Sequence, residues 1–285
     1  MTVVAACVKW VDLRPVVDPV HGTVAASGRG GGFSAADRSA VEVALRLADA
    51  WGGEVVVVCA GPAAADDGLR ELLAAGASRA VRIDLTSDGS GGGDLGSHTC
   101  EEASALLGPV LAELDPTVVV CGDMSADIGS GTVPAYLAHH LGAAQALGLL
   151  EVHPADLGAV RAVRRLDGGR REVLDVTAPA VLSVEGGVAE LRRAALSATL
   201  AARSSAIDVR MGRPVRQGST PRLRPWRPPA RTVDAPSGDR ALDRIVALTG
   251  ALVDRQPPRT VELDPPEAAE AIIEQLRSWG YLPDA

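Results

Sequence analysis

The sequence has few aromatic residues and almost no lysine. Phe, Trp and Tyr make up only 2% of the 285 residues, and Lys9 is the sole lysine. The net charge is -8, and the positive charge comes almost entirely from Arg. Nucleic-acid-binding proteins combine a basic surface with aromatic side chains that stack on bases. The composition therefore argues against a nucleic-acid partner.

Long apolar runs and paired cysteines are also missing. No stretch of 18 or more residues is continuously apolar, so we expect no membrane insertion. The four cysteines are Cys7, Cys59, Cys100 and Cys121, and none has the spacing of a zinc or redox motif, so no metal site is expected. Lys9 interrupts the first apolar run and no basic region precedes it. We therefore expect a first strand and not a signal peptide, and a cytoplasmic location.

Continuous apolar runs alternate with helical patterns in the first two thirds of the chain. Runs that are continuous, and do not alternate with polar residues, are typical of parallel strands covered on both faces. Two helical patterns begin with capping boxes, one formed by Ser34 and Asp37 and the other by Thr99 and Glu102. The pattern predicts an α/β fold with a doubly wound, mostly parallel sheet of the Rossmann-like, adenine-nucleotide-binding type. The expected strands are 2–8, 54–60, 79–85, 117–122 and 179–184, and the expected helices are 34–53, 66–76 and 99–114.

The pattern changes after residue 150. Asp167, Gly168 and Gly169 separate two β-like segments and predict a hairpin. Residues 209–236 are rich in Arg and Pro and predict an extended arm, followed by two helical segments. We therefore expect an α/β domain over residues 1–200 and a C-terminal arm with helices over residues 201–285.

A glycine-rich turn, VVVCGDMSADIGSGTVP, covers residues 118–134 and lies between an expected strand and a helix. Ligands of open parallel sheets bind beyond the carboxyl ends of the strands. Glycines allow close approach of the backbone, and the amides at a helix N-terminus suit a phosphate. Ser125, Ser130 and Thr132 add hydroxyl groups. The turn fits neither the Walker nor the dinucleotide pattern, so a phosphate cradle and an ordinary glycine-rich loop both remain open.

Catalytic constellations are sparse. His139 and His140 are adjacent on a helix, where side chains diverge by about 100°, so they do not easily share a metal. A triad of Ser125, Asp127 and His139 lacks the strained turn that exposes a nucleophile. A nucleotide site without catalytic groups predicts binding or carrying, and we expect no turnover of a small-molecule substrate.

Several blocks of the sequence resemble one family. The chain resembles the β subunits of electron transfer flavoproteins over nearly its whole length. The blocks that carry the resemblance are CVKWV (7–11), SAADRSAVEVALRLAD (34–49), CAGPAAADDGLRELLAAGASRAVRI (59–83), VVVCGDMSADIGSG (118–131), RRLDGGRREVLDVTAPAVLSVE (164–185), ELRRAALSATLAARSSAIDV (190–209) and PPEAAEAIIEQLRSWGYL (265–282).

The resemblance implies an electron carrier without enzymatic turnover. It implies a heterodimer with an α subunit, a redox-active FAD held mostly by that subunit, and a structural AMP in this chain. A flavin-dependent dehydrogenase would donate electrons, and a quinone oxidoreductase or a similar acceptor would receive them. The C-terminal arm would wrap the α subunit. The implied AMP-binding residues are Cys7, Ser34, Ala35, Ala36, Asp37, Ala60, Gly122, Asp123, Met124, Ser125, Ala126, Asp127, Ile128, Gly129, Ser130, Gly131, Thr132 and Val133.

The resemblance also implies a partner-recognition loop at residues 186–200. Leu196 falls where a leucine of the family anchors in a pocket of the dehydrogenase, and Arg192 is the residue kept from the family's motif just before it. An exposed apolar knob is a sensible docking device for a transient partner. The alternative for Leu196 is a helix residue that faces the core of this chain.

The chain departs from the family pattern at several sites, and other functions remain to be tested. The usual Asn-Pro is Ser34-Ala35 here, and a usual Gln-Thr-Gly run is replaced by residues 132–134. One alternative is a bifurcating subunit with a second FAD in place of AMP. Another is a stand-alone adenine-nucleotide-binding module of the stress-protein type, and the last is a nicotinamide dehydrogenase. The loops have no basic or aromatic residues suited to a flavin ring, which favours AMP.

Overall fold

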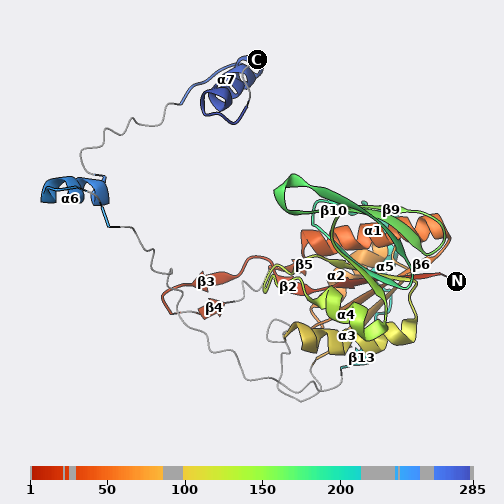
Figure 1. Cartoon of the computed structure of the whole chain (residues 1–285). Helices are drawn as coiled ribbons and strands as arrows, with labels where there is room; N and C mark the ends of the chain where they lie inside the picture. The colour runs from red at the N-terminus through yellow and green to blue at the C-terminus, as the bar shows by residue number, and fades with distance from the viewer. Residues whose placement is uncertain are drawn as a thin grey trace. The chain divides into compact units, whose positions relative to one another are not determined.

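The computed structural model describes residues 2–21, 23–25, 30–85, 99–212, 235–236, 238–250 and 260–282. The chain divides into two compact units, Met1–Trp226 and Arg227–Ala285. The first unit holds the sheet and its helices, and the second holds two helices (Figure 1).

The described residues of the first unit form a nine-stranded sheet in the order β11-β10-β9-β12-β8-β1-β6-β7-β13. All neighbours from β9 to β13 are parallel, whereas β9, β10 and β11 form an antiparallel extension. The strands are β1 (Val3–Val8), β6 (Glu54–Ala60), β7 (Arg79–Asp84), β8 (Val118–Gly122), β9 (Ala144–Pro154), β10 (Ala159–Arg165), β11 (Arg171–Thr177), β12 (Ala180–Val184) and β13 (Asp208–Met211).

Helices cover both faces of this sheet. Buried side chains of α1 and α2 form one apolar cluster, and those of α3 and α4 form a second cluster with the opposite faces of the same strands. Alternate residues of β1 illustrate this, since Val4 belongs to the first cluster and Ala5 to the second. The predicted doubly wound, mostly parallel α/β fold is confirmed. The helices are α1 (Ala35–Trp51), α2 (Ala65–Ala74), α3 (Cys100–Leu114), α4 (Val133–Leu141) and α5 (Leu196–Ala202).

Both predicted capping boxes are present. The backbone N–H of Asp37 donates to Ser34 Oγ, and the backbone N–H of Ser34 donates to a carboxylate oxygen of Asp37. Thr99 and Glu102 make the same reciprocal pair at the start of α3. The two boxes satisfy amides that a helix cannot bond internally, and they fix where α1 and α3 begin.

Smaller elements complete the first unit. The predicted hairpin at Asp167–Gly169 is confirmed, because β10 and β11 pair antiparallel across it. Two short ribbons precede α1, of which the first is braced by an edge-to-face contact between Trp10 and Phe33 with ring centroids 5.3 Å apart. These ribbons are β2 (Trp10–Asp12) with β5 (Gly31–Phe33), and β3 (Val16–Asp18) with β4 (Thr23–Ala25).

The sheet continues past residue 200. Strand β13 pairs parallel with β7, so residues 208–211 belong to the sheet although the sequence analysis assigned them to the arm. The side chains of β13 are mostly exposed at the sheet edge, which explains why it lacks the continuous apolar run of a central strand. Residues 213–234, most of the predicted Arg- and Pro-rich arm, lie outside the described residues.

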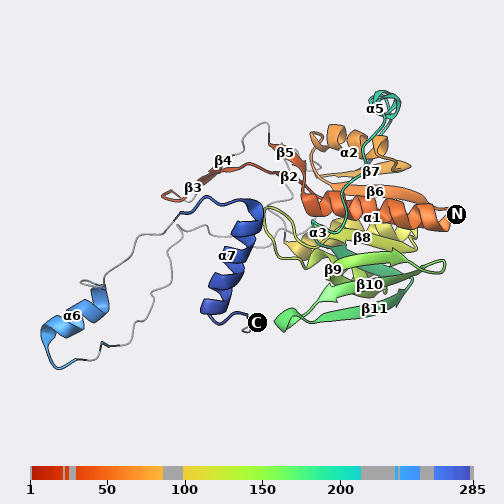
Figure 2. The ribbon, with the colours of Figure 1, turned by 90° about the horizontal axis from the view of Figure 1, so that it is seen from above.

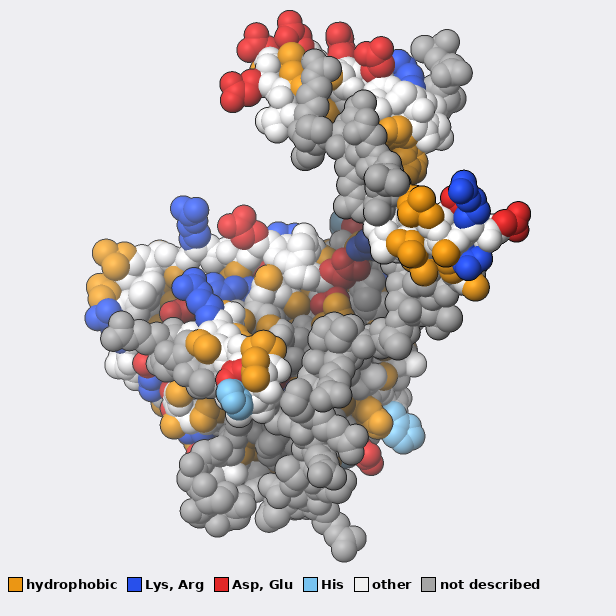
Figure 3. All heavy atoms as spheres, turned by 90° about the vertical axis from the view of Figure 1, so that its left-hand side faces the viewer, with side chains coloured by type: hydrophobic (Ala, Val, Ile, Leu, Met, Phe, Trp, Pro, Cys, Tyr) orange, Lys and Arg blue, Asp and Glu red, His pale blue; other side chains and the backbone are white. Residues whose placement is uncertain are grey.

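The second unit contains α6 (Ala241–Thr249) and α7 (Pro265–Ser278), as the sequence predicted. None of the residues of these helices is buried. Large apolar side chains on them are exposed, including Leu242, Leu248 and Ile272, as is Trp279 at the C-cap of α7. Figure 3 shows hydrophobic side chains at the surface of the molecule. Across the described part of the chain, no helix is long and apolar enough to cross a membrane.

One buried cation ties the ends of two strands together. Arg82 on β7 is only 4% exposed. Its Nε donates to Asp66 Oδ1 at 2.6 Å, and its Nη1 lies 3.1 Å from Asp84 Oδ2 and donates to the Gly61 carbonyl. This network pins the turn that begins at Gly61, directly after β6, to β7.

We expect Arg82→Met to lower the free energy of unfolding by roughly 3 kcal/mol, because removing one member of a buried ionic network leaves a carboxylate without its cation. The matched control is Arg79→Met on the same strand. Arg79 pairs with Glu54 but its side chain is 49% exposed, so the loss should stay below about 1 kcal/mol. Urea unfolding measures both variants. Equal losses would contradict the role given to the Arg82 network.

Candidate functional site

A pocket opens at the carboxyl end of the parallel strands, where the strand order reverses. The chain passes from β1 to β6 and β7 on one side and later returns to β8 on the other side of β1. Helices leave β1 and β8 toward opposite faces at this point, and such a reversal is where open α/β sheets bind ligands. Cys7 and Cys121 are register partners on β1 and β8 and form the floor.

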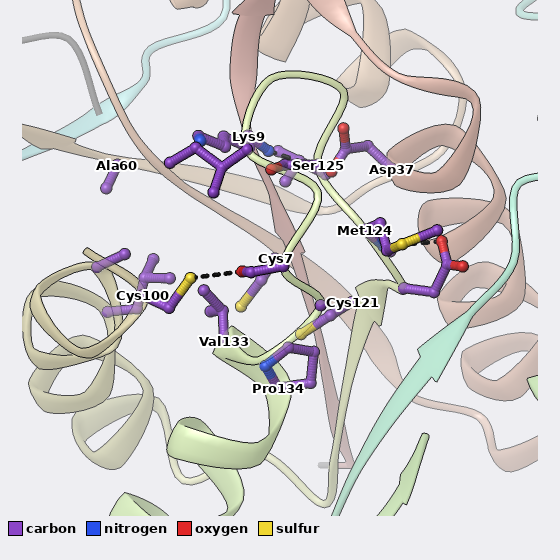
Figure 4. A pocket seen from close by; sticks show the side chains of 18 of the residues that line it. Cys7, Lys9, Asp37, Ala60, Cys100, Cys121, Met124, Ser125, Val133 and Pro134 are labelled. Carbon is purple, nitrogen blue, oxygen red and sulfur yellow. Dashed lines mark hydrogen bonds between the residues drawn. The ribbon is translucent and has the colours of Figure 1, made fainter. Parts of the chain in front are cut away.

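The rest of the wall comes from segments that meet at this edge (Figure 4). They are the end of β1 with Lys9, the start of α1, the end of β6, the first turns of α3, the turn after β8 and the first turn of α4. None of the described lining residues is aromatic. The lining residues are Cys7, Val8, Lys9, Asp37, Ala60, Thr99, Cys100, Ala103, Leu107, Cys121, Gly122, Asp123, Met124, Ser125, Ile128, Ser130, Gly131, Val133 and Pro134.

The structure brings most of the predicted cofactor residues to this pocket. Eleven of them line it, namely Cys7, Asp37, Ala60, Gly122, Asp123, Met124, Ser125, Ile128, Ser130, Gly131 and Val133. The remaining predicted residues belong to the same segments but do not line the pocket, namely Ser34, Ala35, Ala36, Ala126, Asp127, Gly129 and Thr132.

Helix α3 and Lys9 also line the pocket, although the sequence did not predict them as part of the site. The capping box at Thr99 was a usable signal, because a helix that follows one parallel strand and precedes another has one of its ends at the carboxyl edge of the sheet. Cys100 Sγ lies 2.7 Å from Ser130 Oγ, so the start of α3 contacts the glycine-rich turn directly. For Lys9, the usable signal was that the only lysine of the chain interrupts its first apolar run.

The glycines of the turn are required for different reasons. Gly129 and Gly131 adopt left-handed backbone conformations, with φ of 67° and 65°, which side chains disfavour. Gly122 is required by packing within the chain, because a Cβ there would lie 2.9 Å from the Cβ of Ala36. The end of β8 therefore rests directly on the first turn of α1.

Asp37 is the most strongly perturbed carboxyl group of the pocket. Burial raises its pKa from 3.8 to about 6, against the hydrogen bonds from Ser34 and the Lys9 backbone that favour its ionised form. Ser34 Oγ donates to Asp37 Oδ2 at 2.6 Å, and the Lys9 N–H donates to Oδ1 at 3.2 Å. Asp37 thus joins the end of β1 to the start of α1.

Lys9 joins the end of β1 to the glycine-rich turn. Its ammonium lies 2.5 Å from Asp127 Oδ2, and its side chain is only 16% exposed. Burial opposes ionisation of Asp127, but the hydrogen bonds from Lys9, Ser125 and the Ile128 N–H lower its pKa overall. The only ammonium group of the side chains therefore borders the pocket while it anchors the turn.

Two buried cysteines have raised pKa values. A hydrogen bond with Cys7, together with burial, raises the pKa of Cys121 well above its ordinary value, and burial raises that of Cys59 to about 12. Thiols with raised pKa values stay protonated, so Cys121 serves as a small lining group of the floor, whereas Cys59 does not line the pocket. No cluster of three His, Cys, Asp or Glu residues that could hold a metal occurs among the described residues.

The predicted partner-binding residues occupy different environments. Leu196 is the first residue of α5, and it is 75% exposed, which removes the alternative that it packs in the core of this chain. Leu200, one turn further along α5, is 55% exposed. Arg192 lies against α1, where Glu42 and Asp49 accept hydrogen bonds from its guanidinium. Figure 2 shows α5 beside α2, away from β10 and β11.

The pocket has groups that suit the binding of an anion. The pocket offers hydroxyl groups, a glycine-rich turn and the N-terminus of α4 at the switch point of a doubly wound sheet. Fold and pocket together define a doubly wound α/β protein with a pocket at the switch point of its sheet.

Comparison with known proteins identifies the family. Residues 21–210, more than half of the chain, match the electron transfer flavoprotein domain. Protein FixA of Azorhizobium caulinodans is 32% identical over 205 residues, which cover 70% of this chain and 71% of the relative. The electron transfer flavoprotein subunit beta of Mycobacterium tuberculosis is 33% identical over 176 residues, 60% of this chain and 63% of the relative. The corresponding subunit of Syntrophomonas wolfei is 29% identical over 206 residues, 72% of this chain and 77% of the relative.

The chain therefore belongs to the electron transfer flavoprotein family and resembles its beta subunits. The resemblance found in the sequence is confirmed. Members of this family are electron carriers, so the pocket lies in a protein built for electron transfer.

Asp37 gives the site a testable dependence on pH. Its raised pKa means that the folded state holds a proton more tightly than the unfolded state between pH about 4 and 6, so this group reduces stability as pH rises through that window. At roughly 1.4 kcal/mol per pKa unit, the loss reaches about 3 kcal/mol. Asp37→Asn cannot titrate.

The free energy of unfolding of the wild type minus that of Asp37→Asn should fall by about this amount from roughly pH 3 to pH 7 and stay level above it. Denaturant unfolding at several pH values measures the difference. A difference that does not change with pH would rule out the buried, weakly acidic state of Asp37.

Proposed function

We propose that this chain is the β-type subunit of a heterodimeric electron transfer flavoprotein. In this function it accepts electrons from a flavin-dependent dehydrogenase, through FAD at the interface with an α-type subunit, and passes them to a respiratory-chain acceptor such as a quinone oxidoreductase. The single observation that supports this most is the pocket at the switch point, lined by the turn after β8, in a chain of this family.

AMP is the nucleotide that we propose for the pocket, with a structural role. The hydroxyl groups of Ser125 and Ser130, the Lys9 ammonium and the amides of the left-handed turn are suited to a phosphate. The described wall has no aromatic side chain that would sandwich a flavin ring. A second FAD in place of AMP, as in bifurcating complexes, is the alternative that the nucleotide analysis below distinguishes.

The exposed apolar faces of the C-terminal helices favour a stable complex with a partner subunit. Helices α6 and α7 bury none of their residues, and they expose apolar side chains such as Leu248 and Ile272. Isolated helices of this length are only marginally stable in water. We propose that the α-type subunit covers their apolar faces. The chain itself then carries electrons without substrate turnover, in the cytoplasm.

The first experiment is nucleotide analysis of the heterodimer. The chain is co-expressed with its α-type subunit, the complex is purified, and the released nucleotides are quantified by mass spectrometry. We expect one AMP and one FAD per heterodimer. Two FAD would favour a bifurcating subunit. A chain that stays alone and releases ATP would contradict the carrier function.

Substitution at the mouth of the pocket tests where the AMP binds. Cys100 lies at the start of α3 and lines the pocket. Cys100→Trp should fill the space and reduce the AMP content roughly tenfold, whereas Cys100→Ala at the same position should retain it. The FAD content serves as the internal control. Full AMP content in the Trp variant would place the nucleotide elsewhere.

Leu196 and Leu200 form the proposed docking face for the dehydrogenase. Residues four apart on a helix share one face, and both are exposed. Leu196→Ala removes the central apolar contact of this face, so it should raise the KM of the heterodimer as electron acceptor roughly 5- to 30-fold. The kcat should change little, because Leu196 does not line the pocket. The control is Leu157→Ala, which replaces another leucine that is 69% exposed. The assay uses a purified flavin-dependent dehydrogenase that reduces the wild type, and an equal KM for both variants would contradict docking at α5.

A further inference from the structure

The segment between β12 and α5 is fixed to α1 by a set of hydrogen bonds. The Ala189 N–H donates to Ser39 Oγ at 3.0 Å, and Ala189 itself is buried. The Arg192 N–H and Nε donate to Glu42 Oε2 at 3.1 and 3.0 Å, and Nη2 donates to Glu42 Oε1 at 3.3 Å. Nη1 donates to Asp49 Oδ2 at 3.0 Å. Arg192 therefore directs both its backbone and its side chain to α1.

The acceptors on α1 form a site built for this segment. Ser39, Glu42 and Asp49 are separated by three and seven positions, which places them on one face of the helix. The Glu42 side chain is only 6% exposed and also accepts a hydrogen bond from Arg46 Nε at 2.9 Å. A buried carboxylate needs partners of this kind, and Arg192 supplies most of them.

The segment is held again on the far side of α5. Ala202, the last residue of that helix, is 5% exposed, and Arg70 Nε of α2 donates to the Ser205 carbonyl at 3.4 Å. Between the two attachments, Leu196 and Leu200 remain exposed. The anchor at Arg192 thus lies four residues before Leu196 and determines where α5 begins relative to the domain.

We infer that Arg192 is a positioning residue that holds the segment 185–195 on Glu42 of α1 and so sets the direction in which Leu196 projects. Its guanidinium is taken up within the chain and does not contact the partner. The link to docking rests on the proposed function of Leu196, but the anchor itself does not. Without the anchor, a partner must order the segment as it binds, and this cost weakens docking.

The test uses the complete heterodimer and two readouts. Hydrogen exchange measured by mass spectrometry reports the order of peptides over residues 185–203 and needs no dehydrogenase. We expect Arg192→Met and Glu42→Gln to accelerate exchange there roughly tenfold. Arg193→Met is the matched control, because the neighbouring Arg193 is exposed and should leave exchange unchanged.

Two further variants separate anchoring from general loss of structure. Glu42→Gln with Arg192→Met removes both charges, so no buried charge is left without its counterion, and exchange should still rise only over this segment. Arg192→Lys keeps the charge but loses the forked geometry, so it should give an intermediate rate. An unchanged rate over 185–203 in Arg192→Met would overturn the anchor, and acceleration across the whole sheet would show that Arg192 stabilises the fold in general.

Dehydrogenase kinetics supply the second readout. Arg192→Met should raise the KM for the heterodimer roughly 5- to 30-fold, leave kcat within about twofold, and leave the AMP content unchanged. A normal KM in Arg192→Met, in an assay where Leu196→Ala raises it, would overturn the positioning role. If Leu196→Ala has no effect either, the proposed docking function fails, whereas the anchor is still judged by hydrogen exchange alone.

Discussion

The parallel pairing of β1 with both β6 and β8 is the constraint on which the site depends. Parallel strands end at the same edge, so Cys7, Ala60 and Gly122 meet there although they are far apart in sequence. The reversal of strand order at β1 separates the helices that follow and leaves a cleft between them. These strands are buried on both faces, so the sheet edge is rigid. The loops that follow the strands can therefore form a defined pocket at that edge.

Helix α1 links the pocket to the segment that we propose for docking. Its first turn carries Asp37 and packs against Gly122, and its flank carries Glu42, which accepts Arg192. A capping box fixes where the helix begins, so both sets of contacts share one rigid frame. The pocket and the base of α5 are thus placed by the same element, and a change in the register of α1 would move both.

Much of the sheet and part of the site could be predicted from the sequence, because buried strands and capping boxes have local signatures. Strand β9 was missed because its burial is partial and Gly148 interrupts it with a left-handed backbone conformation. Strand β13 was missed because an exposed edge strand does not need apolar residues. The pairing of Arg192 with Glu42 spans 150 positions, so no local pattern reveals it. The same holds for Lys9 and Asp127.

The charge around the pocket restricts how it can hold an anion. Asp37 and Asp123 line the pocket, and the only side-chain ammonium at its wall, that of Lys9, already contacts Asp127. The proposed phosphate would therefore be held by short-range donors, namely amides, hydroxyl groups, the Lys9 ammonium and the start of α4, and not by a long-range positive field. Burial raises the pKa of both Asp37 and Asp123 and so opposes the ionised form of each carboxyl group. The proposed AMP would therefore owe its affinity to close, directional contacts with the glycine-rich turn.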